Sequence, residues 1–329
     1  MKKNLLAIAV GAAVAMPGLA LADSPVVYGK VNITLDHFKT DTAATSDKVW
    51  KLDSNASRVG VKGSYDLDVA NLKAIYQAEF EVHVDGPTGD TLGQRNVFGG
   101  LQGSFGTIKA GRFDTPTKSA QGKIDQFNDL QGDLGKIMAG ENRLSNIVQY
   151  STPKLGDLVT LNLAFIPGEG TVTNNGDTQN GLADSSSISA VLEKDMFYAA
   201  VSHDSDIAAK GFLDSTGDDQ LNITRVAAGV KPGNLELGAL YQMAKESNGD
   251  GKDTSVLVSG AFKIQRVKLK AEYGQTKADL SGEKATQYSL GADYKLAKTS
   301  KVFAYGTRRK LDLADAKTTI FGVGLEHKF

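Results

Sequence analysis

The sequence predicts an all-β protein, a transmembrane antiparallel β-barrel of about 16 strands with one long loop folded inward. Three observations support this class. Apolar and polar residues alternate with a period of two along most of the chain, and tight turns alternate with long polar connections. After the N-terminal segment, no run of about 18 apolar residues predicts a membrane-spanning helix.

The N-terminal segment has the pattern of a secretory signal peptide, which we assign to residues 1–22. Lys2 and Lys3 precede an apolar stretch over 5–15, and the triplet Ala-Leu-Ala ends the segment. The apolar stretch is too short to cross a bilayer. We expect cleavage there and a single barrel domain over 23–329, because no linker or change of composition marks a boundary.

Composition excludes several classes of function. The 37 Lys and Arg residues nearly balance the 38 Asp and Glu residues, whereas a nucleic-acid-binding domain is usually basic. The chain has no cysteine, so disulfides, thiol nucleophiles and zinc sites built on cysteine are excluded. The four histidines are scattered, and neither HExxH nor GxSxG occurs. We therefore expect no enzyme, no cofactor and no metal site.

The predicted strands follow one another along the whole chain after the signal peptide. The clearest is 286–296, where Tyr288 and Leu290 alternate with Ser289 and Gly291. In chain order the sixteen segments are 27–35, 58–62, 72–80, 95–105, 107–113, 145–151, 158–166, 186–194, 196–204, 220–231, 234–244, 254–265, 266–276, 286–296, 300–310 and 318–329.

A soluble β-sandwich would show similar alternation, so the choice of a barrel depends on charge and connection length. One strand face carries charges of both signs, which favours a water-filled interior because a dry core would not bury them. These charged residues are Lys30, Lys62, Lys73, Glu79, Glu81, Lys268, Lys270 and Glu272. Tight turns such as 231–234 and 296–299 alternate with long loops such as 167–185 and 205–219, the layout of a transmembrane barrel.

One insert, about 114–143, lacks the strand period. Long irregular inserts of this kind are usually functional or disordered. Asp125, Asp129 and Asp133 recur every four residues in it, which would place them on one face of a short helical turn. Its apolar residues need a surface to pack against, so we expect the insert to fold inward onto the barrel wall. They are Ile124, Phe127, Leu130, Leu134, Ile137 and Met138.

Several segments resemble the general porins of Gram-negative bacteria. They are VVYGKVNITLD near the start, SNASRVGVKGSYDL, QRNVFGGLQGSFGTIKAGRFDTP and ENRLSNIVQYSTP around the insert, and the terminal GLEHKF. His327 stands where that family more commonly has an aromatic residue. The resemblance implies a sixteen-stranded homotrimer in the Gram-negative outer membrane, in contact with its lipid and lipopolysaccharide, whose third loop constricts the pore.

The resemblance also implies that basic residues on the wall face an acidic third loop. The matching wall residues are Arg58, Arg95 and Arg143, with Arg112 as a further candidate. Arg112 shares its strand face with outward-facing residues unless a bulge at Gly111 turns it inward. Asp125, Asp129 and Asp133 are the candidate loop carboxylates. Arginines favour anions and carboxylates favour cations, so the sequence leaves the sign of selectivity open.

These observations favour an outer-membrane channel for passive diffusion of small hydrophilic solutes and ions. A channel of the same fold that selects an anion or a sugar is one alternative. Another is a secreted or surface β-protein used for adhesion, which would not conduct. The barrel could also be a monomer, because the trimer follows from the resemblance alone.

Overall fold

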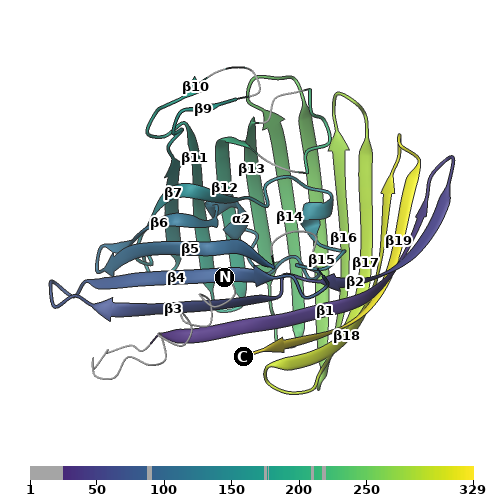
Figure 1. The fold of residues 1–329 in the computed structure, drawn as a ribbon, viewed down its shortest axis with the longest axis horizontal. Helices are drawn as coiled ribbons and strands as arrows, with labels where there is room; N and C mark the ends of the chain where they lie inside the picture. The colour runs from purple at the N-terminus through teal and green to yellow at the C-terminus, as the bar shows by residue number, and fades with distance from the viewer. Residues whose placement is uncertain (1–24, 87–90, 174–175, 177, 209–210, 217–219) are drawn as a thin grey trace, which may run out of the picture.

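Almost every described segment of the chain is a β-strand, and neighbouring strands run antiparallel (Figure 1). The computed structural model describes residues 25–86, 91–173, 176, 178–208, 211–216 and 220–329. The expected signal peptide lies outside these ranges.

The first part of the barrel consists of the strands before the long insert and the two strands that follow it. Its strands are β1 (Val26–Asp41), β2 (Ser46–Ser54), β3 (Arg58–Asp66), β4 (Lys73–Val82), β5 (Leu92–Gly103), β6 (Gly106–Asp114), β7 (Arg143–Ser151) and β8 (Val159–Ile166). A small separate hairpin follows, formed by β9 (Thr171–Val172) and β10 (Thr178–Gln179).

The second part of the barrel is more regular. Its strands are β11 (Ser185–Lys194), β12 (Phe197–Ala208), β13 (Gln220–Val230), β14 (Leu235–Glu246), β15 (Lys252–Ile264), β16 (Val267–Ala278), β17 (Lys284–Lys295), β18 (Ser300–Leu311) and β19 (Ala316–Lys328).

β1 closes the sheet by pairing with β19 over Lys30–Asp41. It also pairs with both β2 and β3, which are two parts of one barrel strand interrupted at 55–57. Counted in this way, the described part of the chain forms a closed barrel of 16 antiparallel strands, as predicted. The sequence did not predict β2, because charged residues at 47, 48, 51 and 53 obscure its alternation.

The barrel has its apolar face outward. On β17, Leu290 is 66% exposed while its neighbour Ser289 is 2% exposed. Val201, Val258 and Phe321 are likewise exposed on other strands. A soluble protein would bury these side chains, whereas a closed barrel in lipid exposes them and pairs its backbone groups between strands.

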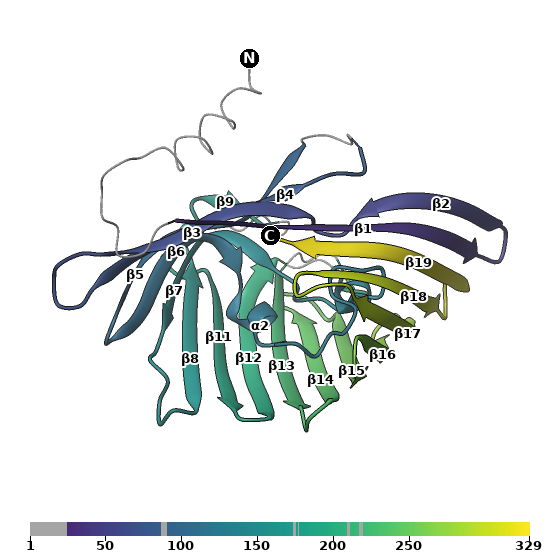
Figure 2. The same ribbon diagram turned by 90° about the horizontal axis from the view of Figure 1, so that it is seen from below.

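The insert lies inside the curve of the strands (Figure 2). We call residues 115–142 loop 3, because β6 ends at Asp114 and β7 begins at Arg143. It contains the short helix α2 (Pro116–Ser119) and the 3-10 helix η1 (Leu134–Lys136). None of the helices in the described ranges is long and apolar enough to cross a membrane. The expected helical turn through 125–133 was wrong, because this stretch forms turns.

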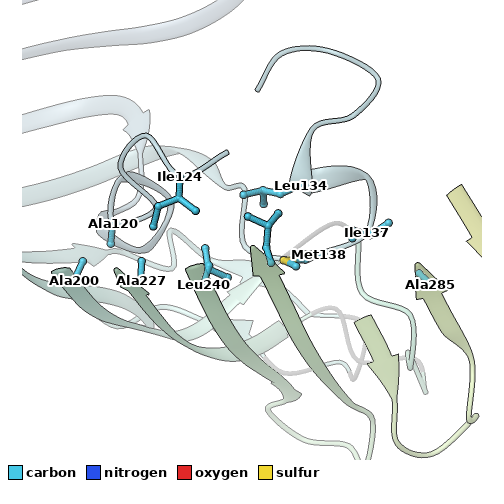
Figure 3. Close-up of a cluster of buried hydrophobic side chains, with 10 residues drawn as sticks. Ala120, Ile124, Leu134, Ile137, Met138, Ala200, Ala227, Leu240 and Ala285 are labelled. Atoms are coloured by element: carbon cyan, nitrogen blue, oxygen red, sulfur yellow. The ribbon is translucent and has the colours of Figure 1, made fainter. Parts of the chain in front are cut away.

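Loop 3 packs against the barrel wall through its apolar side chains, as predicted. Figure 3 shows Ile124, Leu134 and Met138 facing wall residues that include Ala227 and Leu240. A second cluster joins Phe127 and Leu130 to Phe303, Tyr305 and Ile320 of β18 and β19. Burial of each large apolar side chain stabilises the packed loop by roughly 1.5–3 kcal/mol. The several buried side chains of loop 3 together fix it against the wall.

Candidate functional site

Loop 3 meets the opposite wall at Asp129. One carboxylate oxygen, Oδ2, accepts from Lys30 Nζ of β1 at 2.7 Å and from Arg58 Nη2 of β3 at 2.9 Å. Burial opposes ionisation of this carboxyl, but the two cations outweigh it and hold the pKa of Asp129 below its ordinary value. The sequence-predicted Arg58 and Asp129 are thus brought into direct contact.

The wall beside this contact carries a network of alternating charges. Arg95 of β5 donates from Nε to Glu79 at 2.7 Å and from Nη1 to Glu81 at 2.9 Å. Glu79 also lies 3.6 Å from Arg58 Nη1. Arg58 of β3 lies directly opposite Glu81 of β4, so the two side chains share one face of the wall. Lys30, Arg58 and Arg95 therefore form a basic row that the carboxylates of β4 and loop 3 partly neutralise.

Asp125 and Asp133 fold loop 3 instead of facing the wall cations. Asp125 accepts from the backbone N–H groups of Phe127 and Leu134. Burial, with the nearby charge of Glu272, raises the pKa of Asp125 well above its ordinary range. Asp133 caps η1 by accepting from Gly135 N, and it also accepts from Asp129 N. These local bonds explain why only the middle carboxylate of the predicted series pairs with wall cations.

The two other predicted arginines flank loop 3. Arg112 lies near the end of β6, and Arg143 is the first residue of β7. Arg143 contacts Asp114 through Nε at 2.9 Å, and the same nitrogen donates to Asn96 at 2.7 Å. Arg112 donates to Ser145 and lies opposite Val97 of β5. Among the described residues, Arg112 has no ion pair with a loop 3 carboxylate, so its place in the constriction stays a prediction without geometric support.

Sequence reasoning missed the buried cation that holds loop 3. Arg225 of β13 has a fully buried side chain and pairs through Nη1 with Glu141 of loop 3 at 2.9 Å. It also donates to the carbonyl oxygens of Thr117 and Ala139. The available signal was that Arg225 shares the inward face of its strand with Ile223 and Ala227. Charge on an otherwise apolar inward face requires a buried partner.

The site consists of charged side chains held at fixed positions. In the described ranges, no cluster of three His, Asp or Glu side chains has the geometry of a metal site. Instead, a loop crosses the lumen of a closed barrel and presents a carboxylate to cations on the wall. This combination of fold and site defines a channel-forming barrel of the outer-membrane class.

The comparisons with known proteins give the same class. Residues 7–313 match the model of the Gram-negative porin family, and the chain belongs to this family. It is 25% identical over 354 residues to the major outer membrane protein P.IB of Neisseria lactamica, with 100% of both chains covered. It is 25% identical to P.IA of Neisseria meningitidis over 337 residues, covering 88% of this chain and 85% of the relative.

Solved structures show the same fold. An anion-selective porin from Comamonas acidovorans has a TM-score of 0.75 at 19% identity, covering 93% of this chain and 100% of that one. OmpF of Salmonella typhi, solved with daunomycin, has a TM-score of 0.69 at 17% identity, covering 93% and 98%.

The protein is therefore a porin of the Gram-negative outer membrane, a channel for passive diffusion of small hydrophilic solutes and ions. The predicted family, localisation and channel function are confirmed. Family and fold also point to a channel rather than an enzyme.

Proposed function

We propose that the narrowest charged zone of the channel lies where loop 3 meets the row formed by Lys30, Arg58 and Arg95. The observation that carries this proposal is the shared contact of Asp129 with Lys30 and Arg58. Loop 3 touches the wall at this contact, so solutes pass beside it, along Arg95, Glu79 and Glu81 of the neighbouring wall. The field of these opposite charges orients dipolar solutes and penalises apolar ones, because charges bordered by low-dielectric walls are poorly screened.

Reversal potential in a planar bilayer under a potassium chloride gradient tests the position of this zone. Replacing Asp129→Asn removes the loop charge and should shift selectivity toward anions. Replacing Arg58→Gln should shift it toward cations. A unit charge about 4 Å from a passing ion in water is worth ~1 kcal/mol, which changes the permeability of one ion sign by roughly fivefold and that of the other sign by the same factor in the opposite direction.

A matched control is Asp157→Asn, which removes a carboxylate from the exposed turn between β7 and β8. Its positive φ of 56° is compatible with asparagine. This variant should leave the reversal potential unchanged. Unshifted potentials in both Asp129→Asn and Arg58→Gln would place the charged zone elsewhere in the lumen.

We also propose that the barrel assembles as a homotrimer after cleavage of residues 1–22 and contacts lipopolysaccharide. Family membership supports the trimer, and conductance steps in groups of three are the expected readout. Outward-facing Lys284, Arg308 and Lys310 border a recess of about 510 Å³ beside Tyr288, at the end of the barrel opposite the short turns. Phosphates of an outer-leaflet glycolipid fit these cations. Lipopolysaccharide should therefore copurify less with Lys284→Gln/Lys310→Gln than with the parent protein.

A further inference from the structure

A recess of about 550 Å³ lies at the end of the barrel that carries the short turns, bordered by β15–β19. Short turns face the periplasm in barrels of this class. Its lining includes Lys263, Arg266 and Lys268 from one turn and its strands, and Lys295, Lys298 and Lys301 from the next. We call this recess with these six residues the basic vestibule.

The strand phase places the vestibule at the inner side of the mouth. Lys268 alternates with Val267 and Leu269, and Leu269 is exposed on the outer, apolar face. Two residues further along the same inner face, Lys270 is buried and its Nζ lies 4.8 Å from the ring centre of Phe127 in loop 3. The cations therefore continue from the periplasmic mouth to the loop that crosses the lumen.

Cations outnumber carboxylates in this region. Glu236 accepts from Lys263 at 2.6 Å and from Lys268 at 2.7 Å, and it also lies 3.3 Å from Lys231. One carboxylate therefore serves three lysines, which leaves an excess of positive charge around it.

A smaller imbalance occurs on the next strand pair. Asp293 is shared between Lys270 and Lys301, at 3.0 Å and 2.9 Å, and Glu326, which also lines the recess, lies 3.9 Å from Lys301 and 3.3 Å from Lys328. Two carboxylates therefore face three lysines. For Arg266, Lys295 and Lys298, no carboxylate lies within ion-pair distance among the residues that the structure describes. Donors of these three side chains are available to a ligand.

We propose that the basic vestibule binds small dissolved anions that carry two or more carboxylate or phosphate groups. Several separated cations bind an anion with several charged oxygens better than chloride, because each charged oxygen can meet its own donor. Arg266 can hold one such group with two parallel hydrogen bonds, and the lysines act as point charges. A concave mouth with one excess sign also concentrates the opposite ion before it enters the channel.

This inference needs the lumen of the channel but not the contact between Asp129 and Arg58. It predicts an asymmetry that a constriction in the middle of the barrel would not produce. A multivalent anion added on the periplasmic side reaches the vestibule directly, whereas one added on the other side must first pass loop 3.

The test records potassium chloride current through channels inserted in one orientation, while citrate or pyrophosphate is added to either side. Block should occur at lower concentration from the side of the short turns. The variant Arg266→Gln/Lys298→Gln should raise the half-blocking concentration about fivefold, because two donors without a carboxylate partner are then missing from the site. The matched control Lys154→Gln/Lys194→Gln removes two lysines of other short turns and should leave block unchanged.

Calorimetric titration of the folded, detergent-solubilised protein with pyrophosphate gives a readout that does not need conduction. Binding that weakens about fivefold in Arg266→Gln/Lys298→Gln, but not in the control, supports the vestibule even if a preparation carries no current. Equal block from both sides, or equal binding by the two double variants, would overturn the inference. A protein that carries no chloride current but still binds pyrophosphate would contradict the open channel, whereas anion binding at the vestibule would still be supported.

Discussion

Arg225 offers a direct test of how loop 3 is held in place. Its guanidinium donates to Glu141 and to the carbonyl oxygen of Thr117 through Nη1, and to the carbonyl oxygen of Ala139 through Nη2. Nε donates to Gln242 of the neighbouring strand at 2.8 Å. One buried side chain thus joins both ends of loop 3 to the wall. Arg225→Met keeps most of its volume and removes all of these bonds.

Arg225→Met should destabilise the packed position of loop 3 and leave the barrel intact. Breaking a buried ion pair by removing one partner costs about 3–5 kcal/mol, because the remaining charge stays buried. The backbone pairing of β13 with β12 and β14 does not involve this side chain. A loss of about 3 kcal/mol raises the population of a locally detached loop by roughly a hundredfold.

Trypsin cleavage within loop 3 and open-channel current noise measure this population. Both should rise in Arg225→Met, while Arg308→Met on β18, which lies on the outward face, should resemble the parent protein. Adding Glu141→Gln to Arg225→Met removes the orphaned charge and should recover part of the protection. Cleavage and noise equal to the parent in Arg225→Met would refute the assignment of Arg225 as the anchor of loop 3.

Two further predictions concern a glycine within β6 and an external loop. Gly111 has a φ of 144°, and a Cβ there would lie 2.3 Å from the carbonyl oxygen of Val97. Gly111→Ala should therefore lower the yield of heat-modifiable folded barrel by destabilising it by about 1–3 kcal/mol, whereas Gly99→Ala, which meets open space, should not. Burial opposes ionisation of Asp214, but backbone N–H donors that include Leu280 outweigh it and lower its pKa below 3.8. The ionised Asp214 therefore stabilises this loop above about pH 4, and the stabilisation is lost as the pH falls through the lowered pKa. Amide exchange at Leu280 should accelerate only in strong acid. In Asp214→Asn the same exchange should accelerate already at neutral pH.

Strand alternation was sufficient to predict the barrel because lipid and water impose opposite requirements on its two faces. Segment 286–296 alternates cleanly, and the structure gives β17 over nearly the same residues. β2 was missed because the exposed Trp50 and Leu52 stand among charged neighbours in the sequence. Alternation predicts a strand only where both environments act on it.

Charge spacing predicted the site less well than alternation predicted the strands. Asp125, Asp129 and Asp133 look equivalent in the sequence, yet two of them bond the backbone of their own loop. Asp129 reaches the wall from a left-handed turn with a φ of 68°, a conformation that residue spacing does not reveal. The contact with Arg58 depends on the path of loop 3 across the lumen, and this path depends on long-range packing.

The packing of loop 3 on β13 and β14 has a consequence for engineering this channel. Ala227 and Leu240 point inward, and the loop covers them. Shortening the loop to widen the passage would expose an apolar strip of the wall to the water-filled lumen. This strip would bind apolar solutes or hold the shortened loop in collapsed conformations. A wider variant therefore requires paired changes, with a shorter loop and polar replacements on the strands beneath it.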